Sequence, residues 1–490
     1  MIYKNEAETA KNGSLVPVFM NGKLMHSKYN PQNEALQFAK SAERADLFII
    51  LGLGGGYHIE ALLNIYPNAK FIVAENSDED IQNLLEIPCV KALSDRITLC
   101  TKETLSKTIL SLYNPILFEK LSIISQRAWA QNYPEIDAAF RAIIDATLKN
   151  ISADYSVQAH FGRHWHRNIL MNLKYLSKNA NVFPFPITKQ AMTKTAAIIA
   201  AGPSLDESTE KIKKEREKYF VIATDTAFST LTKRGISSDV VISIDAQNVS
   251  YKHFLCSTES EKKSLCVFDL SSPPSSVRKV EALGYPIFFA ISKHPLAQLA
   301  SQFFPFMTLE SGAGTVTIAA ADFARQLGFE KIELFGADFA YSRGKAYTKG
   351  TYLDSIYRQN EKRINNAETE FCALMYRTEL AEKEKRVFTT PMLESYASTT
   401  EYFFSSHGFE KIGDNLYKSQ TAFEKKSNYD SEKKFPFAEF REYLLKEKES
   451  QNALFAHLPA MAAIKAKQMK NNSIFMLLKL AYSATVRYTN

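Results

Sequence analysis

The chain has few of the features that mark secreted, membrane-spanning or metal-binding proteins. It contains five cysteines in 490 residues, with no CxxC pair and no nearby histidine at metal-ligand spacing, so we expect free thiols and no metal site. Residues 1–14 lack the apolar segment of a secretory signal. The longest apolar run near the C-terminus, residues 474–484, is interrupted by Lys479 and is too short to span a bilayer. We therefore expect a cytoplasmic protein with no membrane span.

Strong charge bias, internal repeats and low-complexity segments are also missing from the sequence. The formal net charge of +7 is mild and too weak to argue for nucleic acid as a partner. It suits anionic small ligands or acidic partners. The composition, 45% hydrophobic and 23% charged, is that of an ordinary globular protein, and the length predicts two or three domains.

The first chemical pattern is a glycine loop near the N-terminus. Residues 46–64 read as a strand, a loop with Gly52, Gly54 and Gly56, and a helix, and Glu75 ends the next predicted strand. A glycine loop followed by an acidic residue about 20 positions later is typical of units that bind a nucleotide. It would fit S-adenosylmethionine or a dinucleotide. The spacing matches the dinucleotide pattern only in part, so a Rossmann-like unit without a ligand is the alternative.

Helical patterns follow this unit and return at the C-terminus. Residues 115–181 are predicted to be helical, with apolar residues at steps of three and four from residue 134 onward. His160 and His164 lie four apart, but no carboxylate or cysteine accompanies them, so a polar helix face is favoured over a metal site. Residues 438–490 are helical and rich in lysine, which indicates a solvated face.

The stretch TAAIIAAGPSLDE, residues 195–207, organises the rest of the chain. It reads as a buried strand, a tight turn through Gly202 and Pro203, and a helix capped by Ser204 or Asp206. A helix N-terminus after a glycine turn at the end of a strand is a ready site for an anion, usually phosphate. An ordinary turn that binds nothing is the alternative from these residues alone.

Later strands favour a binding cleft at this point. Four predicted strands of the central unit end in polar or turn residues. The carboxyl ends of parallel strands share one edge of the sheet, where ligands bind. Four such ends in one unit favour a cleft over four unrelated turns. These ends are Gly202–Ser204, Thr224–Asp225–Thr226, Asp245–Gln247 and Gly336–Asp338.

Five motifs in order resemble a known family. These motifs make the chain similar to the motility accessory factor proteins, which are bacterial flagellin glycosyltransferases. The similarity extends from about residue 15 to residue 420. The central unit of that family is in turn similar to bacterial sialyltransferases that use CMP-sialic acid. The motifs are HSKYNPQNEA (26–35), IIAAGPSLD (198–206), SIDAQ (243–247), SGAGTVTIAAADFARQLGFEKIELFGADFAYSRGKAYTKG (311–350) and TTPMLESY (389–396).

The resemblance implies transfer of a nonulosonic acid, pseudaminic or legionaminic acid, from its CMP donor to Ser or Thr hydroxyls of flagellin. It implies no obligatory cofactor or metal. Tyr341 and Tyr347 are the closest counterparts of two tyrosines that hold the leaving phosphate in the sialyltransferases. The resemblance and the positions of the strand ends together make the following residues candidates for binding the donor nucleotide: Gly202, Pro203, Ser204, Thr224, Asp225, Asp245, Ser311 and Gly312.

The chain departs from the sialyltransferase pattern in two ways. Ala201 stands where those enzymes usually carry Asn, so one contact to the nucleotide is missing. Their general-base histidine has no clear match, although His294 follows a strand and His407 lies downstream in roughly the right order. Asp338 is a further hypothesis for the base, because it lies just past the end of a strand.

The predicted fold is α/β, with two Rossmann-like α/β units, a helical linker and a helical C-terminal region. The first unit is small, and the second is larger and sialyltransferase-like. The expected domains are residues 1–115 (Rossmann-like), 116–182 (helical connector), 183–400 (catalytic) and 401–490 (mainly helical).

Two other functions remain open at this point. The same central domain occurs in archaeal-type 6-hydroxymethylpterin diphosphokinases, which transfer pyrophosphate from ATP and should need Mg²⁺ carboxylates. Those proteins are much shorter, and the N-terminal motifs argue against them. The second is a flagellar binding module that has kept the fold without turnover, an idea that Ala201 and the missing histidine favour.

Overall fold

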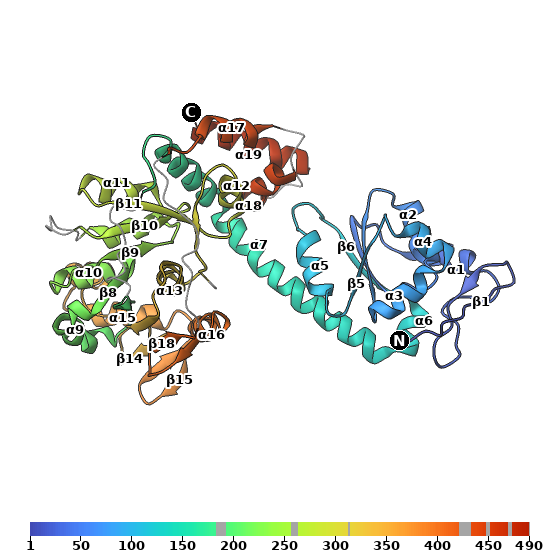
Figure 1. The fold of residues 1–490 in the computed structure, drawn as a ribbon, viewed down its shortest axis with the longest axis horizontal. Helices are drawn as coiled ribbons and strands as arrows, with labels where there is room; N and C mark the ends of the chain where they lie inside the picture. The colour runs from blue at the N-terminus through green and yellow to red at the C-terminus, as the bar shows by residue number, and fades with distance from the viewer. Residues whose placement is uncertain are drawn as a thin grey trace. The chain divides into compact units, whose positions relative to one another are not determined.

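The computed structural model describes residues 1–182, 193–255, 263–311, 314–420, 433–446, 451–468 and 473–489. The chain forms two compact units. Unit 1 comprises Met1–His160 with Gln468–Phe475, and unit 2 comprises Phe161–Lys467 with Met476–Asn490. Each unit contains a mainly parallel sheet with helices packed on it (Figure 1), which confirms the predicted α/β class with two Rossmann-like units.

Unit 1 is built on a four-stranded parallel sheet in the order β5-β4-β3-β6. The central strand β3 consists of five apolar residues, all fully buried, as a strand covered on both faces requires. The strands are β3 (Leu47–Leu51), β4 (Lys70–Glu75), β5 (Thr98–Thr101) and β6 (Leu121–Ser125), with a short hairpin of β1 (Glu8–Thr9) and β2 (Leu15–Val16). The helices are α1 (Pro31–Ser41), α2 (Tyr57–Ile65), α3 (Asp78–Leu85), α4 (Pro88–Leu93), α5 (Leu105–Leu112) and α6 (Arg127–Asn132).

Strand β6 lies inside the range that the sequence predicts to be helical, so that prediction was wrong for these five residues. A strand this short has little periodicity of its own, and it is fixed by pairing with β3, from Leu47 with Leu121 to Leu51 with Ser125. The helical prediction holds beyond it, because α7 (Pro134–Leu176) is a single helix of 43 residues.

Unit 2 contains a nine-stranded sheet in the order β12-β11-β10-β9-β8-β7-β13-β18-β17. The chain moves outward from β7 to β12 and then returns to the other side of β7 with β13, so the strand order reverses between β7 and β13. Among the described strands of this sheet, β18 alone runs antiparallel to the others, because it pairs antiparallel with both β13 and β17. The strands are β7 (Thr195–Ile199), β8 (Tyr219–Thr224), β9 (Val240–Ser243), β10 (Leu265–Asp269), β11 (Ile287–Ile291), β12 (Met307–Thr308), β13 (Lys331–Phe335), β17 (Phe409–Lys411) and β18 (Leu416–Ser419).

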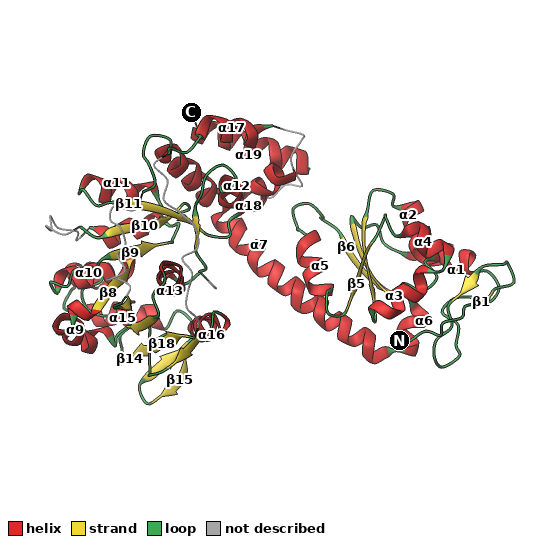
Figure 2. Cartoon of the chain, in the orientation of Figure 1, coloured by secondary structure: helices red, strands yellow, loops and turns green. Residues whose placement is uncertain are grey.

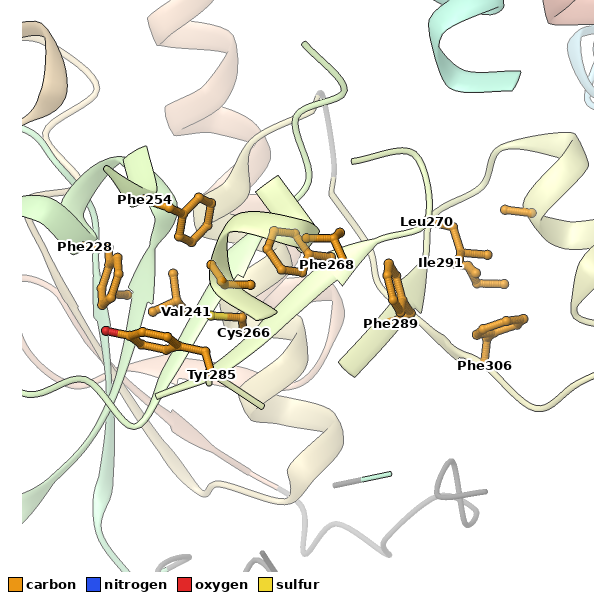
Figure 3. Packing of buried hydrophobic residues seen from close by; sticks show 14 of the residues in the cluster. Phe228, Val241, Phe254, Cys266, Phe268, Leu270, Tyr285, Phe289, Ile291 and Phe306 are labelled. Carbon is orange, nitrogen blue, oxygen red and sulfur yellow. The ribbon is translucent and has the colours of Figure 1, made fainter. Parts of the chain in front are cut away.

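Side chains alternate between two cores on the faces of this sheet. In β7, Ala197 and Ile199 join the core on one face, and Ala196 and Ile198 join the core on the other. Figure 3 shows part of the first core, where aromatic rings from several elements pack together. The first face packs against α9 (Leu205–Lys214), α10 (Asp225–Lys233), α11 (Pro274–Ala282), α12 (Pro295–Ala300), α17 (Phe437–Leu445) and α18 (Gln451–Gln468), and the second packs against α13 (Val316–Leu327) and α16 (Pro391–Ser406).

An insertion after β13 forms a small layer of its own (Figure 2). It contains a three-stranded antiparallel sheet and two helices, whose apolar residues gather around Ala346, Phe371 and Met375. Helix α19 completes the C-terminal region. The bounds are β14 (Tyr341–Ser342), α14 (Tyr352–Gln359), α15 (Ala367–Met375), β15 (Ala381–Glu384), β16 (Val387–Thr389) and α19 (Ile474–Thr489).

One predicted boundary needs correction. The sequence predicts a helix of small residues over 311–327, but α13 begins only at Val316, with Thr315 as its N-cap. Gly314 adopts a positive φ of 92°, which a helix interior does not allow. Within the described ranges, no helix is both long and apolar enough to cross a membrane.

Histidines are buried where α7, α18 and α19 meet within unit 2. His166 Nε2 lies 2.7 Å from Thr485 Oγ1, and the His166 and His457 ring centroids are 5.2 Å apart. His457 Nε2 donates a hydrogen bond of 3.2 Å to the Leu444 carbonyl, and burial lowers the pKa of His457 to about 4. Burial also lowers the pKa of His166, so both rings are neutral in the folded protein near neutral pH.

Acidification should destabilise unit 2 through these histidines. An unfolded histidine takes up a proton near pH 6.5, whereas folded His457 does so only near pH 4, so the free energy of unfolding falls as the pH drops between these values. His457 contributes about 3 kcal/mol to this loss. We expect His457→Leu to be less stable than wild type at pH 7.5 but to lose less stability between pH 7.5 and 4.5.

Guanidinium unfolding followed by fluorine NMR would measure this. The chain has two tryptophans, Trp129 in unit 1 and Trp165 in unit 2, so 5-fluorotryptophan gives one signal for each unit. An equal loss of unit 2 stability in both proteins would contradict the prediction.

Candidate functional site

A cavity of about 280 Å³ opens at the carboxyl ends of β7 and β13 in unit 2. These are the neighbouring strands between which the strand order reverses, and open α/β sheets bind ligands at such a reversal. The ends of β7 and β8, the turn after β13, the start of α13 and part of α16 all contribute to its wall. The predicted strand-end cleft therefore corresponds to a cavity in the structure.

The turns after β7 and β13 are in close contact at the base of this cavity. Gly202 N donates a hydrogen bond of 2.8 Å to the Gly336 carbonyl. A Cβ atom on Gly202 would lie 2.5 Å from that carbonyl and would also overlap the Asp338 carboxylate. A Cβ on Gly336 would overlap the Ala200 carbonyl. Both positions need glycine because the two backbones approach so closely.

Asp338 occupies the anion-binding position at the start of α9. Its Oδ2 atom accepts a hydrogen bond of 2.8 Å from Ser204 N, so a side chain 134 residues downstream caps this helix. The sequence predicted capping by Ser204 or Asp206, and this was wrong. The Ser204 hydroxyl makes no cap bond within the described residues, and the Asp206 carboxylate turns toward a different loop.

Asp206 instead fixes the loop that follows β14. Its carboxylate accepts hydrogen bonds from Lys345 Nζ at 3.1 Å and Thr348 Oγ1 at 2.5 Å, and it forms an ion pair with Arg234. Burial opposes its ionisation, but the hydrogen bonds from Thr348, Arg234 and Lys345 lower the pKa of Asp206 to about 2. Thr348 N also donates to the Ala201 carbonyl, which ties this loop to the turn after β7.

Four aromatic side chains line the cavity: Phe339, Tyr341, Tyr347 and Tyr396. Burial raises the pKa of Tyr347 to about 12 and also raises that of Tyr341, so both phenols keep their protons at neutral pH and can donate hydrogen bonds. Phe339 has a positive φ of 47°, which is rare for a side chain of this size and costs about 1–3 kcal/mol. Strain of this kind is common at functional sites.

The start of α13 forms another part of the cavity wall. Gly314, Thr315, Val316 and Thr317 line it, and α13 is a 12-residue helix. The N-terminus of such a helix carries a partial positive charge. Gly314 N and Thr315 N donate to the Ser311 carbonyl, and Thr317 N donates to Thr315 Oγ1 at 3.2 Å. Ser311 precedes this segment and is half-buried but is not part of the lining, and predicted Gly312 lies outside the described residues.

The predicted residues after β8 and β9 divide into two groups. Thr224 and Thr226 line the cavity. Asp225 is only 1% exposed, and its carboxylate accepts hydrogen bonds from Ser243 Oγ at 2.6 Å and Thr226 N at 2.7 Å. Asp245 is half-buried outside the lining, and burial together with the nearby Asp225 carboxylate raises the pKa of Asp245.

The cavity wall carries little charge. Among its described lining residues Asp338 is the one carboxylate, and lysine and arginine do not occur there. Anion binding at this wall would therefore rely on the partial positive charge at the start of α13 and on hydroxyls. Within the described ranges, no three or more His, Cys, Asp or Glu side chains are arranged to hold a metal ion.

The N-terminal glycine loop of unit 1 is packed against side chains of its own unit. Gly52 adopts a φ of 93°, and a Cβ atom there would lie 2.8 Å from the Trp129 ring. The same tryptophan donates a 2.9 Å hydrogen bond from Nε1 to Glu75, which also accepts from Leu53 N and Tyr3 Oη. Burial raises the pKa of Glu75 to about 7.

The other predicted glycines of this loop are equally enclosed. A Cβ on Gly54 would lie 2.8 Å from His26 Nε2, and one on Gly56 would lie 3.1 Å from Leu93. His26 also accepts a 2.9 Å hydrogen bond from Gly55 N. In residues 1–182, all described, the loop glycines and Glu75 thus serve the packing of the unit.

Comparisons with known proteins agree with this architecture. Residues 167–344 match the family described as 6-hydroxymethylpterin diphosphokinase MptE-like, and this range includes both strands that border the cavity. The fold is similar to that of the MAf glycosyltransferase from Magnetospirillum magneticum AMB-1, with a TM-score of 0.51 and 14% identity, over 100% of this chain and 87% of that chain. The protein therefore has a Maf glycosyltransferase-like fold.

Two uncharacterized proteins of Treponema pallidum (strain Nichols) are related in sequence. One is 29% identical over 290 residues, which are 57% of this chain and 97% of that protein. The other is 38% identical over 152 residues, which are 31% of this chain and 70% of that protein. The chain belongs to the same family as this second protein.

Replacing Asp338 should loosen the turn at the base of the cavity. Asp338→Ala removes the carboxylate that accepts from Ser204 N, and the loss of a helix cap lowers the free energy of unfolding of unit 2 by about 1–2 kcal/mol. Ser204→Ala is the matched control and should change it by less than about 0.5 kcal/mol, because its hydroxyl is not the cap. Equal effects in chemical unfolding would contradict the assignment.

Proposed function

We propose that this protein transfers a nonulosonic acid of the pseudaminic or legionaminic type from its CMP-activated donor to Ser or Thr hydroxyls of flagellin. The observation that carries the proposal is the cavity between the ends of β7 and β13, whose wall combines a helix N-terminus, hydroxyls and aromatic rings. The motifs that resemble the motility accessory factor proteins supply the sugar class and the acceptor. The likeness to a glycosyltransferase fold supports the same assignment.

The charge of the cavity suits this donor. The phosphate of a CMP-linked sugar is a diester with one negative charge, which the partial positive charge at the start of α13 and the hydroxyl groups of the wall can stabilise without a cationic side chain. A nucleoside triphosphate carries several negative charges, and the described lining offers one carboxylate and neither lysine nor arginine to meet them.

Aromatic residues give the reaction its electrostatic support. As the anomeric carbon separates from the phosphate, it develops positive charge and negative charge grows on CMP. The phenols of Tyr341 and Tyr347 are protonated and line the cavity, so they can donate hydrogen bonds to that growing charge. Asp206 acts indirectly, because it fixes the loop that carries Tyr347.

The match to the MptE-like family favours one rival, ATP-dependent pyrophosphoryl transfer to a pterin. Nucleotide preference separates the two functions. If the proposed function is right, CMP should bind without a metal ion. A pterin pyrophosphoryl transferase should instead bind ATP with Mg²⁺. A non-catalytic flagellar module would bind CMP without hydrolysing or transferring the donor sugar.

Tyr347→Phe should test the leaving-group role. Removing one donor to a developing charge lowers turnover about 10²–10³-fold. We expect that loss in donor hydrolysis or transfer, with CMP affinity in calorimetry reduced only a few fold. Tyr402→Phe, at an exposed position on α16, is the matched control and should behave as wild type. Preference for ATP with Mg²⁺, or equal turnover of both variants, would contradict the proposal.

A further inference from the structure

A cavity of about 320 Å³ opens in unit 1, between α7 and the turn that follows α5. Its lining lies within residues 110–158, all of which are described, so it belongs to unit 1 alone and is separate from the cavity of unit 2. Its volume falls in the range of about 300–1,000 Å³ that is usual for small-molecule sites.

One wall is the turn at the end of α5. Tyr113 is the C-cap of this helix, and its N–H donates to the Ile109 carbonyl at 2.8 Å. Asn114 forms the turn, because its Oδ1 accepts from Ile116 N at 2.8 Å and its carbonyl accepts from Phe118 N at 3.0 Å. The Tyr113 ring stacks on the Phe118 ring, with centroids 6.5 Å apart. These contacts fix Tyr113 and Asn114 at the cavity wall.

Another wall is one face of α7. Asn150, Asp154 and Gln158 follow one another at steps of four residues, so they form a polar row along the helix. A rise of 1.5 Å per residue places neighbouring members about 6 Å apart along the axis. Ile151 and Tyr155 lie beside this row and also line the cavity. The face therefore combines hydrogen-bonding groups with apolar surface.

The two walls are held together within the core of unit 1. Thr147 Oγ1 of α7 donates a 2.9 Å hydrogen bond to Ser106 Oγ of α5, and Figure 1 shows the two helices beside one another. Ile109 of α5 and Ile144 of α7 are fully buried in the same core. The cavity is therefore set by the packing of the unit and does not need a ligand to form.

Several polar groups of this cavity remain available to a ligand. Within the described part of the chain, the Asn150 side chain and the hydroxyls of Tyr113 and Tyr155 make no hydrogen bond. Asp154 accepts from Gln158 Nε2 at 2.6 Å through Oδ2, which leaves Oδ1 as an acceptor. Burial raises the pKa of Tyr113, so its hydroxyl keeps its proton and can donate.

Charge restricts the class of ligand. The lining, which lies wholly within the described residues 110–158, contains the Asp154 carboxylate but neither lysine nor arginine. A phosphate or carboxylate would meet a like charge there without a cation to offset it, so the cavity suits a neutral ligand.

The remaining lining groups match a sugar. Side-chain amides and phenol hydroxyls both donate and accept hydrogen bonds, as the hydroxyl groups of a sugar do. The rings of Tyr113 and Tyr155 and the side chain of Ile151 offer apolar surface to the C–H faces of a sugar ring. Leu110 adds further apolar surface to the lining and is 57% exposed.

We propose that this cavity is a binding site for a neutral oligosaccharide. Asn150, Asp154 and Gln158 bind hydroxyl groups along the edge of the sugar chain, and Tyr113 and Tyr155 contact its ring faces. The polar row spans about 12 Å, which suits more than one sugar unit. The site makes and breaks no bond. It does not depend on the proposed transferase function, because the CMP-activated donor is anionic and is assigned to the cavity of unit 2.

A glycan array probed with the full chain tests the class of ligand. We expect binding to neutral oligosaccharides and discrimination against sialylated and phosphorylated glycans. Failure to bind every neutral glycan on the array, or a preference for the anionic ones, would overturn the inference.

Calorimetry with the tightest-binding neutral glycan of the array tests the location. Asn150→Ala should weaken the affinity about 2–10-fold, because one hydrogen bond is lost. Tyr155→Ala should weaken it at least about tenfold, because an aromatic contact is lost. Lys149→Ala, at an exposed position of α7 outside the lining, and Tyr29→Ala, at a 55% exposed position of unit 1, are the matched controls and should bind as wild type.

Methyl NMR of isoleucine-labelled protein locates the glycan without a change in the site. The Ile151 signal should shift on saturation, whereas that of Ile65, which is 40% exposed on α2 outside the lining, should stay. Replacement of each by valine assigns the two signals. Unchanged affinity in both Asn150→Ala and Tyr155→Ala, or an unmoved Ile151 signal, would overturn the inference.

The outcome is independent of the test of the proposed function. Tyr347→Phe in unit 2 should leave glycan affinity unchanged. Protein that binds CMP but no neutral glycan would refute this site alone, and protein that binds the glycan but not CMP would refute the transferase alone.

Discussion

The close contact between two glycine turns determines the geometry of unit 2. Gly202 and Gly336 end neighbouring strands on either side of the strand-order reversal, and their backbones are joined by a direct hydrogen bond. Asp338 adds a second connection through Ser204 N. Because side chains are excluded at both glycines, the strand ends stay together and the lining residues converge above them. The cavity and the Tyr347 loop both depend on this contact.

Unit 1 has a similar topology with different side chains around its glycine loop. Its strand order also reverses, between β3 and β6, and glycines follow β3 as they would in a nucleotide-binding unit. There the Trp129 ring lies against Gly52, and Glu75 is saturated with hydrogen bonds from within the unit. The difference lies in which side chains the loops contribute, and function is assigned from that chemistry rather than from the fold.

The sequence predicts the strands of both sheets well, because buried parallel strands are continuous apolar runs bounded by turn residues. It also predicts the cleft, since polar residues after successive strands must meet at one edge. It missed β6, whose five residues are fixed by pairing with β3, and the strands β12, β17 and β18 at the edges of the nine-stranded sheet. It also missed the Asp338 cap, because this cap joins residues far apart in the chain. The four predicted domain ranges and the predicted roles of the site residues remain predictions.

A crystal structure of the full chain with CMP would test the central claim most directly. The account predicts the nucleotide in the unit 2 cavity, with its phosphate at the start of α13 and within hydrogen-bond distance of the Tyr347 hydroxyl. It also predicts that Asp338 keeps its bond to Ser204 N. CMP bound beside Gly52 and Glu75 in unit 1, or a phosphate that displaces Asp338 from α9, would contradict the account.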